Sequence, residues 1–341
     1  MKRILCGLLL ICILLSGCAA GAGEHEQKHY TATFLTLFDT LTTIKGPAES
    51  EEAFSEMVQK IHDDLLACHQ LFDIYNDYEG INNLKTVNDA AGTAPVTVDR
   101  RIIDLLLDCK EYYATTHGKV NVAMGSVLHL WHEARNDSMD NPAAAYLPDS
   151  AELAEAAKHW SMDSLVIDEE ASTVFLTDPD ARLDVGAIAK GWSVEYAAKN
   201  APEGFLISVG GNVRATGPKT KDTPWVVGVS DPKDPNAYLH TLYLSEGSLV
   251  TSGDYQRYFV VEGKPYHHII DPDTLYPSEY WSSVTIVCKD SGLADALSTA
   301  LFLMDQDNGQ KLLDRYDAEA LWVDRDGNLF YSPGFQDLIR T

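Results

Sequence analysis

The sequence has few basic residues for its length. Only 26 of its 341 residues are Lys or Arg, against 51 Asp and Glu, so the formal net charge is −25. A surface this acidic repels phosphate backbones and anionic lipid, which argues against nucleic acid as a partner. An anionic ligand would therefore need a metal ion or a few well-placed cations.

Cysteine is also scarce, and its spacing is uninformative for metal or disulfide chemistry. Beyond the N-terminal segment the chain keeps Cys68, Cys109 and Cys288. Three scattered cysteines give neither a disulfide framework nor a Cys-x-x-Cys metal site. Cys68 and Cys109 lie in apolar helical patterns and Cys288 ends an apolar strand, so we expect buried thiols that act as small hydrophobic side chains.

The N-terminal apolar run is too short to span a membrane. Lys2 and Arg3 precede about a dozen apolar residues, which suits the core of a signal peptide. The run ends in Leu-Ser-Gly-Cys at residues 15–18, a pattern that resembles a bacterial lipobox. We therefore expect a signal peptide over residues 1–17, lipidation (palmitate among the acyl chains) at Cys18, and a flexible tether over residues 18–29. The protein would then be lipid-anchored to the cell membrane on its extracytoplasmic side; an ordinary secretory signal with an incidental cysteine is the alternative.

No Gly-Ser or Pro-rich linker and no internal repeat divides residues 30–341, and the hydrophobic content of 45% is that of a globular core. Apolar periodicity predicts helices over residues 50–75, 99–113 and 150–160, with a polar surface excursion over residues 136–148. Strands and hairpins are predicted over residues 164–168, 173–177, 205–215, 225–230, 239–244, 258–261, 267–270 and 284–287. Strand pairs bracketed by helices indicate an α+β fold, a single large domain with a mainly antiparallel sheet flanked by helices.

Residues 184–191 form the most informative segment. Leu183 and Val185 read as a strand end, Gly186 as the turn, and residues 188–199 as a helix. A glycine-assisted turn into a helix N-terminus suits a phosphate, and Lys190 would supply a cation. A strand, a turn and a helix with one Gly and one Lys are also common without a ligand.

The helix predicted over residues 294–304 carries a polar stripe on an otherwise apolar segment. Asp295, Ser298 and Thr299 stand at i, i+3 and i+4 and therefore share one face. A carboxylate and hydroxyls are hard oxygen ligands suited to Mg²⁺. Helix capping is the alternative, because Asp in a first turn favours the helix dipole and Ser or Thr can bond a preceding carbonyl.

Two further polar segments could serve a site. Residues 266–272 read as a strand that carries two histidines into an Asp-Pro turn, so a histidine there could be a general base or a half-exposed strand residue. Residues 251–255 form a polar loop that could contact a ligand or merely turn.

Together and in this order, these segments resemble the ApbE family of FAD:protein FMN transferases. The family's Asp-turn-Lys-Gly pattern matches residues 184–191, its Gly-Gly-Asn hairpin residues 208–212, its Ser-Gly loop residues 251–257, its His-x-Ile-Asp-Pro signature residues 268–272, and its Ala-Asp-Ala-x-x-Thr helix residues 294–299. The resemblance covers about residues 30–335 and implies an ApbE-like, T-fold-like α+β domain. Many members are membrane-anchored lipoproteins, which agrees with the N-terminal segment.

The resemblance also implies a set of site residues. Mg²⁺ would be bound by the carbonyl of Ala187 and by Asp295 and Thr299, with Ser298 at a position that is sometimes a ligand. FAD contacts would fall on Phe38, Tyr75, Lys119, Val120, Asn121, Asp184, Lys190 and Ile270.

The chain departs from the family pattern at two positions. Phe38 stands where members usually have Met, which keeps an apolar flavin contact but alters its shape. Leu275 stands where members have Gly, and a turn that requires positive φ would tolerate Leu poorly. We therefore expect the loop at Leu275 to take a different course.

The implied reaction splits the FAD pyrophosphate, moves FMN onto a threonine hydroxyl of an acceptor protein and releases AMP. Such a transfer needs Mg²⁺ and charge neutralisation more than covalent chemistry by the protein. His268 is the candidate for accepting the hydroxyl proton. The acceptors that the family suggests are subunits of Na⁺-pumping NADH:quinone reductase (Nqr) or Rnf-type complexes, or other extracytoplasmic flavoproteins.

Two other functions share the same groups. The site could hydrolyse FAD to FMN and AMP with water as the acceptor, or the chain could be a lipoprotein that binds flavin or metal without turnover. The sequence separates these three poorly.

Overall fold

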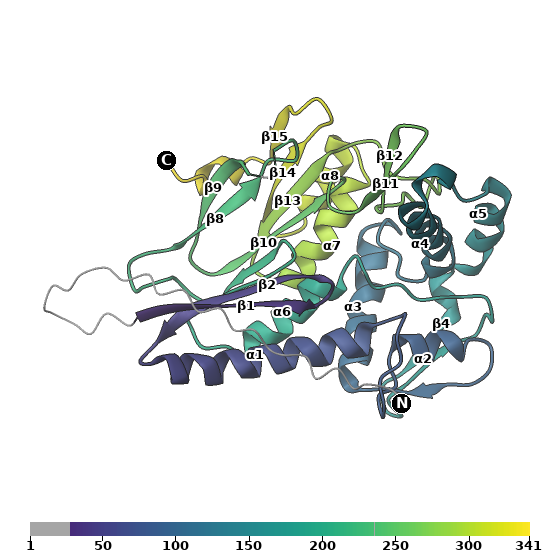
Figure 1. Cartoon of the computed structure of the whole chain (residues 1–341), viewed down its shortest axis with the longest axis horizontal. Coiled ribbons are helices and arrows are strands. Elements are labelled where there is room, and N and C mark those ends of the chain that lie inside the picture. Colours follow the sequence, from purple (N-terminus) through teal and green to yellow (C-terminus); the bar gives the residue numbers. More distant parts are fainter. Residues whose placement is uncertain (1–27, 235) are drawn as a thin grey trace, which may run out of the picture.

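An eight-stranded sheet, antiparallel throughout, forms the centre of the computed structural model (Figure 1), which describes residues 28–234 and 236–341. Its strands, in spatial order, are β1 (Lys28–Leu37), β2 (Thr40–Ala48), β6 (Leu206–Val209), β7 (Asn212–Ala215), β10 (Gly247–Gly253), β13 (Ser283–Cys288), β14 (Ala318–Val323) and β15 (Leu329–Tyr331). Smaller sheets pair β3 (Val96–Thr97), β5 (Thr173–Leu176) and β4 (Leu165–Asp168); β8 (Trp225–Ser230) with β9 (Tyr238–Leu244); and β11 (Tyr258–Val261) with β12 (Lys264–His267).

The longer helices are α1 (Glu51–Phe72), α2 (Leu84–Asp89), α3 (Arg100–Thr115), α4 (Gly125–Asp140), α5 (Ser150–Ala156), α6 (Ala189–Lys199), α7 (Ser291–Phe302) and α8 (Gln306–Leu313). Figure 1 shows α1 along β1 and β2 and α7 along β10 and β13, while α2, α4 and α5 gather beyond one end of the sheet. Among the described residues, no helix combines the length and the apolar character that a membrane span requires.

Both faces of the central sheet are covered, and successive side chains of its strands pack into two different hydrophobic clusters. Val250 and Trp322 pack with the helices, whereas their neighbours Leu249 and Leu321 pack under the β8–β9 ribbon. This two-residue period is what a strand imposes, because successive side chains point to opposite faces. The predicted α+β class with a mainly antiparallel sheet in a single domain is confirmed.

Several predicted elements are confirmed with small shifts of their ends. Ser50 caps α1 by accepting a hydrogen bond from the Ala53 N–H, and Asp99 caps α3 by accepting one from the Arg101 N–H. The β4–β5 and β6–β7 hairpins form as predicted, and β8 and β11 match their predicted bounds. Cys68, Cys109 and Cys288 are free and buried, as expected.

Other expectations are wrong in identifiable ways. Residues 136–140 belong to α4 rather than to a surface excursion, because an apolar face anchored by Trp131 and Ala134 extends the helix through a polar stretch. Residues 183–185 form no strand; Arg182 makes only an isolated bridge to Met124. The strand predicted over residues 267–270 ends at His267.

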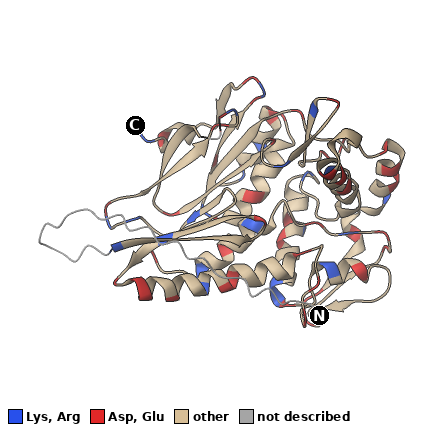
Figure 2. Ribbon diagram, viewed as in Figure 1, with Lys and Arg blue, Asp and Glu red and all other residues tan. Residues whose placement is uncertain are grey.

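The N-terminal hairpin of β1 and β2 was not predicted, since its residues mix threonines with apolar positions. It begins at Lys28, so the last two residues of the expected tether belong to the sheet, and the His29 ring packs edge-on against Trp225. Cys18 and the rest of the expected signal and tether lie outside the described residues. Acidic residues spread over many elements, among them α1, α4 and α5 (Figure 2).

Candidate active site

Helices α6 and α7 touch where Asp295 meets the start of α6. The Asp295 carboxylate is 3% exposed, and its Oδ2 accepts a hydrogen bond of 2.8 Å from the Gly191 N–H. The Lys190 ammonium lies 3.9 Å from the same oxygen. Burial raises the pKa of Asp295, and Lys190 and the Gly191 N–H only partly offset that effect. The carboxylate is thus a buried negative charge with incomplete compensation, which a bound cation would relieve.

The capping explanation fails for Asp295. Asp290 is the N-cap of α7, its Oδ1 accepting a hydrogen bond of 2.9 Å from the Leu293 N–H, so Asp295 lies in the second turn. Ser298 does follow the alternative reading: its Oγ donates to the Asp295 carbonyl at 2.9 Å and also lies 2.8 Å from Ser252 Oγ. Thr299 is half-buried on the same stretch of helix. Carboxylate and hydroxyl oxygens of this kind fit Mg²⁺ better than a softer metal.

The turn before α6 supplies a second carboxylate. Two hydrogen bonds fix Asp184. Its backbone N–H donates to the Val122 carbonyl at 2.8 Å, and its side-chain Oδ1 accepts from the Gly186 N–H at 2.8 Å. Burial raises the pKa of Asp184, while the positive charge of Arg257 opposes that rise. None of the described side chains caps the N-terminus of α6, and Ala187 lies half-buried just before it. That helix end therefore suits an anionic group.

Lys119, Val120 and Asn121 run beside this turn. The Lys119 ammonium pairs with Asp271 Oδ1 and Asp273 Oδ2, both at 2.8 Å, so it ties the segment to the Asp-Pro turn. Asn121 donates to the Trp160 carbonyl at 3.1 Å, and Val120 is buried.

The Asp-Pro turn is closed by a backbone bridge between the buried Ile270 and Pro277. Leu275 takes φ of 64°, in the region that favours glycine, so the expectation that leucine would avoid this conformation is wrong. Its N–H donates to the Asp271 carbonyl at 2.8 Å and its carbonyl accepts from Trp131 Nε1 at 2.9 Å. These bonds hold the strained residue in place.

Tyr75 lies just past the end of α1, with half of its surface exposed. Its ring stacks on His132 of α4 at a centroid distance of 4.5 Å, and its hydroxyl lies 3.3 Å from His132 Nδ1. Burial, followed by the negative charge of Asp184, raises the pKa of Tyr75. Phe38, with φ of 53° at the tip of the β1–β2 hairpin, donates its N–H to His69 Nδ1 at 3.3 Å and packs edge-on against that ring.

His268 follows β12 directly. Its Nδ1 lies 3.2 Å from the Arg257 carbonyl; because a carbonyl only accepts, Nδ1 carries the proton and Nε2 keeps a free lone pair. The residue as a whole is exposed, but desolvation of its ring, followed by the positive charges of Arg257 and Lys190, lowers the pKa of His268. The imidazole is therefore neutral near pH 7 and has a lone pair to accept a proton, although the lower pKa also makes it a weaker base.

The sequence analysis did not predict His69, His132 or Arg135 as site residues. It included Arg257 only as the end of the Ser-Gly loop and not as a positive charge at the site. His132 and Arg135 stand at i and i+3 on α4, a helix that was not predicted and whose residues 136–140 were read as a surface excursion. Recognising that helix would have placed both side chains on one face.

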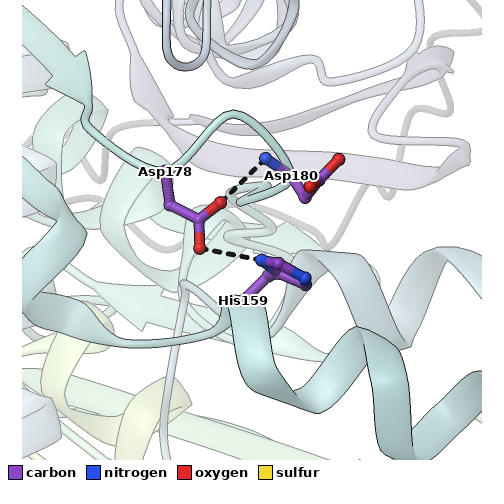
Figure 3. Close-up of side chains that lie close together, drawn as sticks. All are labelled: His159, Asp178 and Asp180. Atoms are coloured by element: carbon purple, nitrogen blue, oxygen red, sulfur yellow. Dashed lines mark hydrogen bonds and ion pairs between the residues drawn. The ribbon is translucent and has the colours of Figure 1, made fainter.

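A separate cluster of possible metal ligands lies outside this site. His159, Asp178 and Asp180 have ligand atoms within 4.8 Å of one another (Figure 3), and none of them was predicted as a ligand. His159 Nδ1 already pairs with Asp178 Oδ2 at 2.8 Å, and Asp178 Oδ1 accepts from the Asp180 N–H. The cluster is therefore an ion pair between His159 and Asp178 next to a turn that ends at Asp180. No further observation among the described residues indicates a ligand there.

Comparisons with known proteins identify the family of this chain. The sequence model of the ApbE family matches residues 38–322. FAD:protein FMN transferases from Klebsiella pneumoniae and Treponema pallidum are 32% and 31% identical to this chain, covering 80% and 98% of it and 86% and 94% of their own lengths. The ApbE protein of Thermotoga maritima superposes with a TM-score of 0.82 at 30% identity, covering 92% of this chain and 100% of its own. The flavin transferase ApbE of Vibrio cholerae superposes with a TM-score of 0.74 at 23% identity and supports the fold. The chain therefore belongs to the ApbE family and is a flavin transferase.

Proposed function

We propose that this protein transfers FMN from FAD to a threonine hydroxyl of an acceptor protein, with Mg²⁺ as cofactor and AMP as the second product. The observation that carries the proposal is the buried Asp295 carboxylate at the α6–α7 contact, with Lys190 and the Gly191 N–H on a single oxygen. Among the described residues no hydrogen bond or ion pair reaches the second oxygen, Oδ1, which leaves it available to a cation.

The residues that fit Mg²⁺ are Asp295, Thr299 and the Ala187 carbonyl, with Ser298 beside them. When bound there, the ion would offset the negative charge of the pyrophosphate and the charge that develops on it. Lys190 would add a positive charge on the same side, since its ammonium stands at the start of α6. Phe38, Tyr75, Ile270, Asp184 and residues 119–121 would surround the rest of FAD.

His268 would act on the acceptor. Its neutral ring, with the proton on Nδ1, takes the proton of the threonine hydroxyl at Nε2. The threonine Oγ then forms a bond to the FMN phosphorus, the bond from that phosphorus to the bridging oxygen breaks, and the bridging oxygen leaves with AMP. The role of this chain is to position these groups and exclude water, which would otherwise be the acceptor.

We further propose that Cys18 carries lipid and anchors the enzyme to the outer face of the cell membrane. Support comes from residues 2–18, where a basic start, a short apolar run and Leu-Ser-Gly-Cys follow in order. An acceptor such as an Nqr or Rnf-type subunit would then be reached at the same surface.

The test is incubation of the purified protein with FAD, Mg²⁺ and a threonine-bearing acceptor domain, followed by mass spectrometry of the acceptor and chromatography of the nucleotides. Covalent FMN on the acceptor and equimolar AMP are expected. An acceptor whose threonine is replaced by valine serves as the control. Free FMN with AMP and an unmodified acceptor would indicate a hydrolase, and unchanged FAD would indicate a binding protein; either result contradicts the proposal.

A further inference from the structure

The two lysines expected among the FAD contacts already lie beside carboxylates. Lys119 pairs with both Asp271 and Asp273, and Lys190 lies beside Asp295. Even with the proposed Mg²⁺ beside it, a dianionic pyrophosphate in a chain with a net charge of −25 would be stabilised by further positive charge, because these two lysines leave little available.

Arg135 and Arg257 are different, because neither forms an ion pair with a carboxylate among the described residues. Arg257 donates from Nη2 to the Phe38 carbonyl at 3.5 Å, and Arg135 donates from Nη2 to His132 Nδ1 at 3.1 Å and to Asn136 Oδ1 at 3.4 Å. All three acceptors are neutral; Arg135 is half-buried, whereas Arg257 is exposed. A half-buried guanidinium without a counter-charge is costly unless an anion arrives.

His132 holds Arg135 and Tyr75 together. A guanidinium can only donate, so His132 Nδ1 accepts from Arg135, and the neutral ring then carries its proton on Nε2, 2.8 Å from the side-chain amide of Asn136. The Tyr75 hydroxyl lies 3.3 Å from the same Nδ1. Burial, followed by the positive charge of Arg135, lowers the pKa of His132 and keeps the ring neutral. Tyr75, an expected FAD contact, is thereby tied to an arginine.

Arg257 comes from the segment just before β11 and contacts the tip of the β1–β2 hairpin. It contacts Phe38, whose ring packs on His69 of α1, the helix that leads to Tyr75. The positive charge of Arg257 acts on Asp184, His268 and Tyr75. Burial, followed by the positive charge of Arg257, lowers the pKa of Arg135.

We propose that Arg135 and Arg257 bind the phosphate groups of FAD, with His132 positioning Arg135 and the Phe38 carbonyl positioning Arg257. This inference rests on the proposed function, in which FAD is the substrate. The guanidinium group suits the task because its planar donors match two phosphate oxygens at once.

The experiment compares FAD and riboflavin binding by calorimetry in the wild type, Arg135→Gln, Arg257→Gln and Arg315→Gln. Riboflavin has the same ring system but no phosphate. Arg315 is the matched control. Like Arg257 it donates to one backbone carbonyl, that of Thr115 at 3.5 Å, and it follows α8, outside the segments that form the candidate site. We expect each of the first two variants to weaken FAD binding by about tenfold or more, to leave riboflavin binding unchanged, and to reduce the salt dependence of FAD affinity.

Three outcomes would overturn the inference. FAD affinity equal to that of Arg315→Gln would show that the arginines do not meet phosphate. An equal loss of affinity for FAD and for riboflavin would show that the two arginines only shape the flavin pocket. A lowered melting temperature in the same variants would trace that loss to a disturbed structure. A wild type that does not bind FAD would overturn the proposed function as well, whereas unchanged variants of an FAD-binding wild type would overturn this inference alone.

Discussion

Gly191 and Asp295 are in direct contact across the α6–α7 interface, and the contact requires glycine. The Gly191 N–H donates to Asp295 Oδ2 at 2.8 Å, and a Cβ on Gly191 would stand 2.5 Å from Asp295 Cβ and closer still to the Ser291 carbonyl oxygen. Real Cβ atoms do not approach backbone and side chain this closely, so the close approach of the helices, and with it the position of the carboxylate, depends on the missing side chain.

Gly191→Ala should therefore separate α6 from α7. Overpacking of this kind costs roughly 1–3 kcal/mol of stability, and it should reduce transferase activity because Asp295 is displaced. Thermal melts and turnover measure the two effects. Gly309→Ala in α8 is the control: its new Cβ would meet Leu301 and Trp322 only at 3.4 and 3.5 Å, and it should leave activity unchanged. Full activity in Gly191→Ala would show that the close contact is unimportant.

Asp295→Asn should separate function from stability. The amide oxygen can still accept from the Gly191 N–H, and a buried charge is removed, so the melting temperature should stay level or rise. Turnover should fall by at least about a hundredfold, the scale seen when a preorganised electrostatic group is lost, and added Mg²⁺ should restore little of it. Asp290→Ala, which removes the α7 cap, should do the reverse: it should cost about 1 kcal/mol of stability and leave turnover intact. An active Asp295→Asn enzyme would refute the metal site.

Lys190→Ala should weaken FAD binding by about tenfold or more, the value of one charge-assisted hydrogen bond. Lys199→Ala, at the other end of α6, removes the same charge and should bind FAD normally. Binding is measured by flavin fluorescence. Equal FAD dissociation constants for the two variants would reduce Lys190 to an ordinary helix residue.

His267 should make the fold acid-sensitive. The ring is buried, donates from Nε2 to the Ser278 carbonyl at 2.8 Å and accepts at Nδ1 from the Ile269 N–H, so only the neutral form fits. Burial lowers the pKa of His267 from 6.5 to about 4. The unfolded chain therefore binds the proton first, and this part of the stability, at most roughly 3 kcal/mol, is present above pH 6.5 and is lost as the pH falls towards about 4. His267→Gln keeps the bond to Ser278 and should flatten the decline in melting temperature over that range; an unchanged slope would assign the acid sensitivity to other groups.

Cys18→Ser should release the protein from the membrane fraction, since lipid attachment needs the thiol. The soluble variant should keep its activity on FAD and a soluble acceptor. Fractionation followed by immunoblotting measures the distribution. Retention of the variant in the membrane fraction would contradict lipidation at this residue.

The sequence by itself determined the α+β class, the helices over residues 50–75 and 99–113 to within a few residues at their ends, and the membership of the ApbE family. These properties depend on neighbours within about four residues or on motifs with a fixed order. It also picked out Asp295, but could not decide between a cap and a ligand, because that choice depends on where α7 begins.

Only the tertiary structure decided which residues contact one another across the fold. Gly191 and Asp295 are 104 residues apart in the chain, and no local pattern predicts which helix a carboxylate will meet. Packing between distant segments likewise decides the pairing of Lys119 with Asp271 and the proton positions on His267 and His268. It also leaves Arg135 and Arg257 without an ion pair to a carboxylate among the described residues. The physical reason is that hydrogen bonds and charges act over a few ångströms of space, and folding, rather than sequence distance, decides which groups share that space.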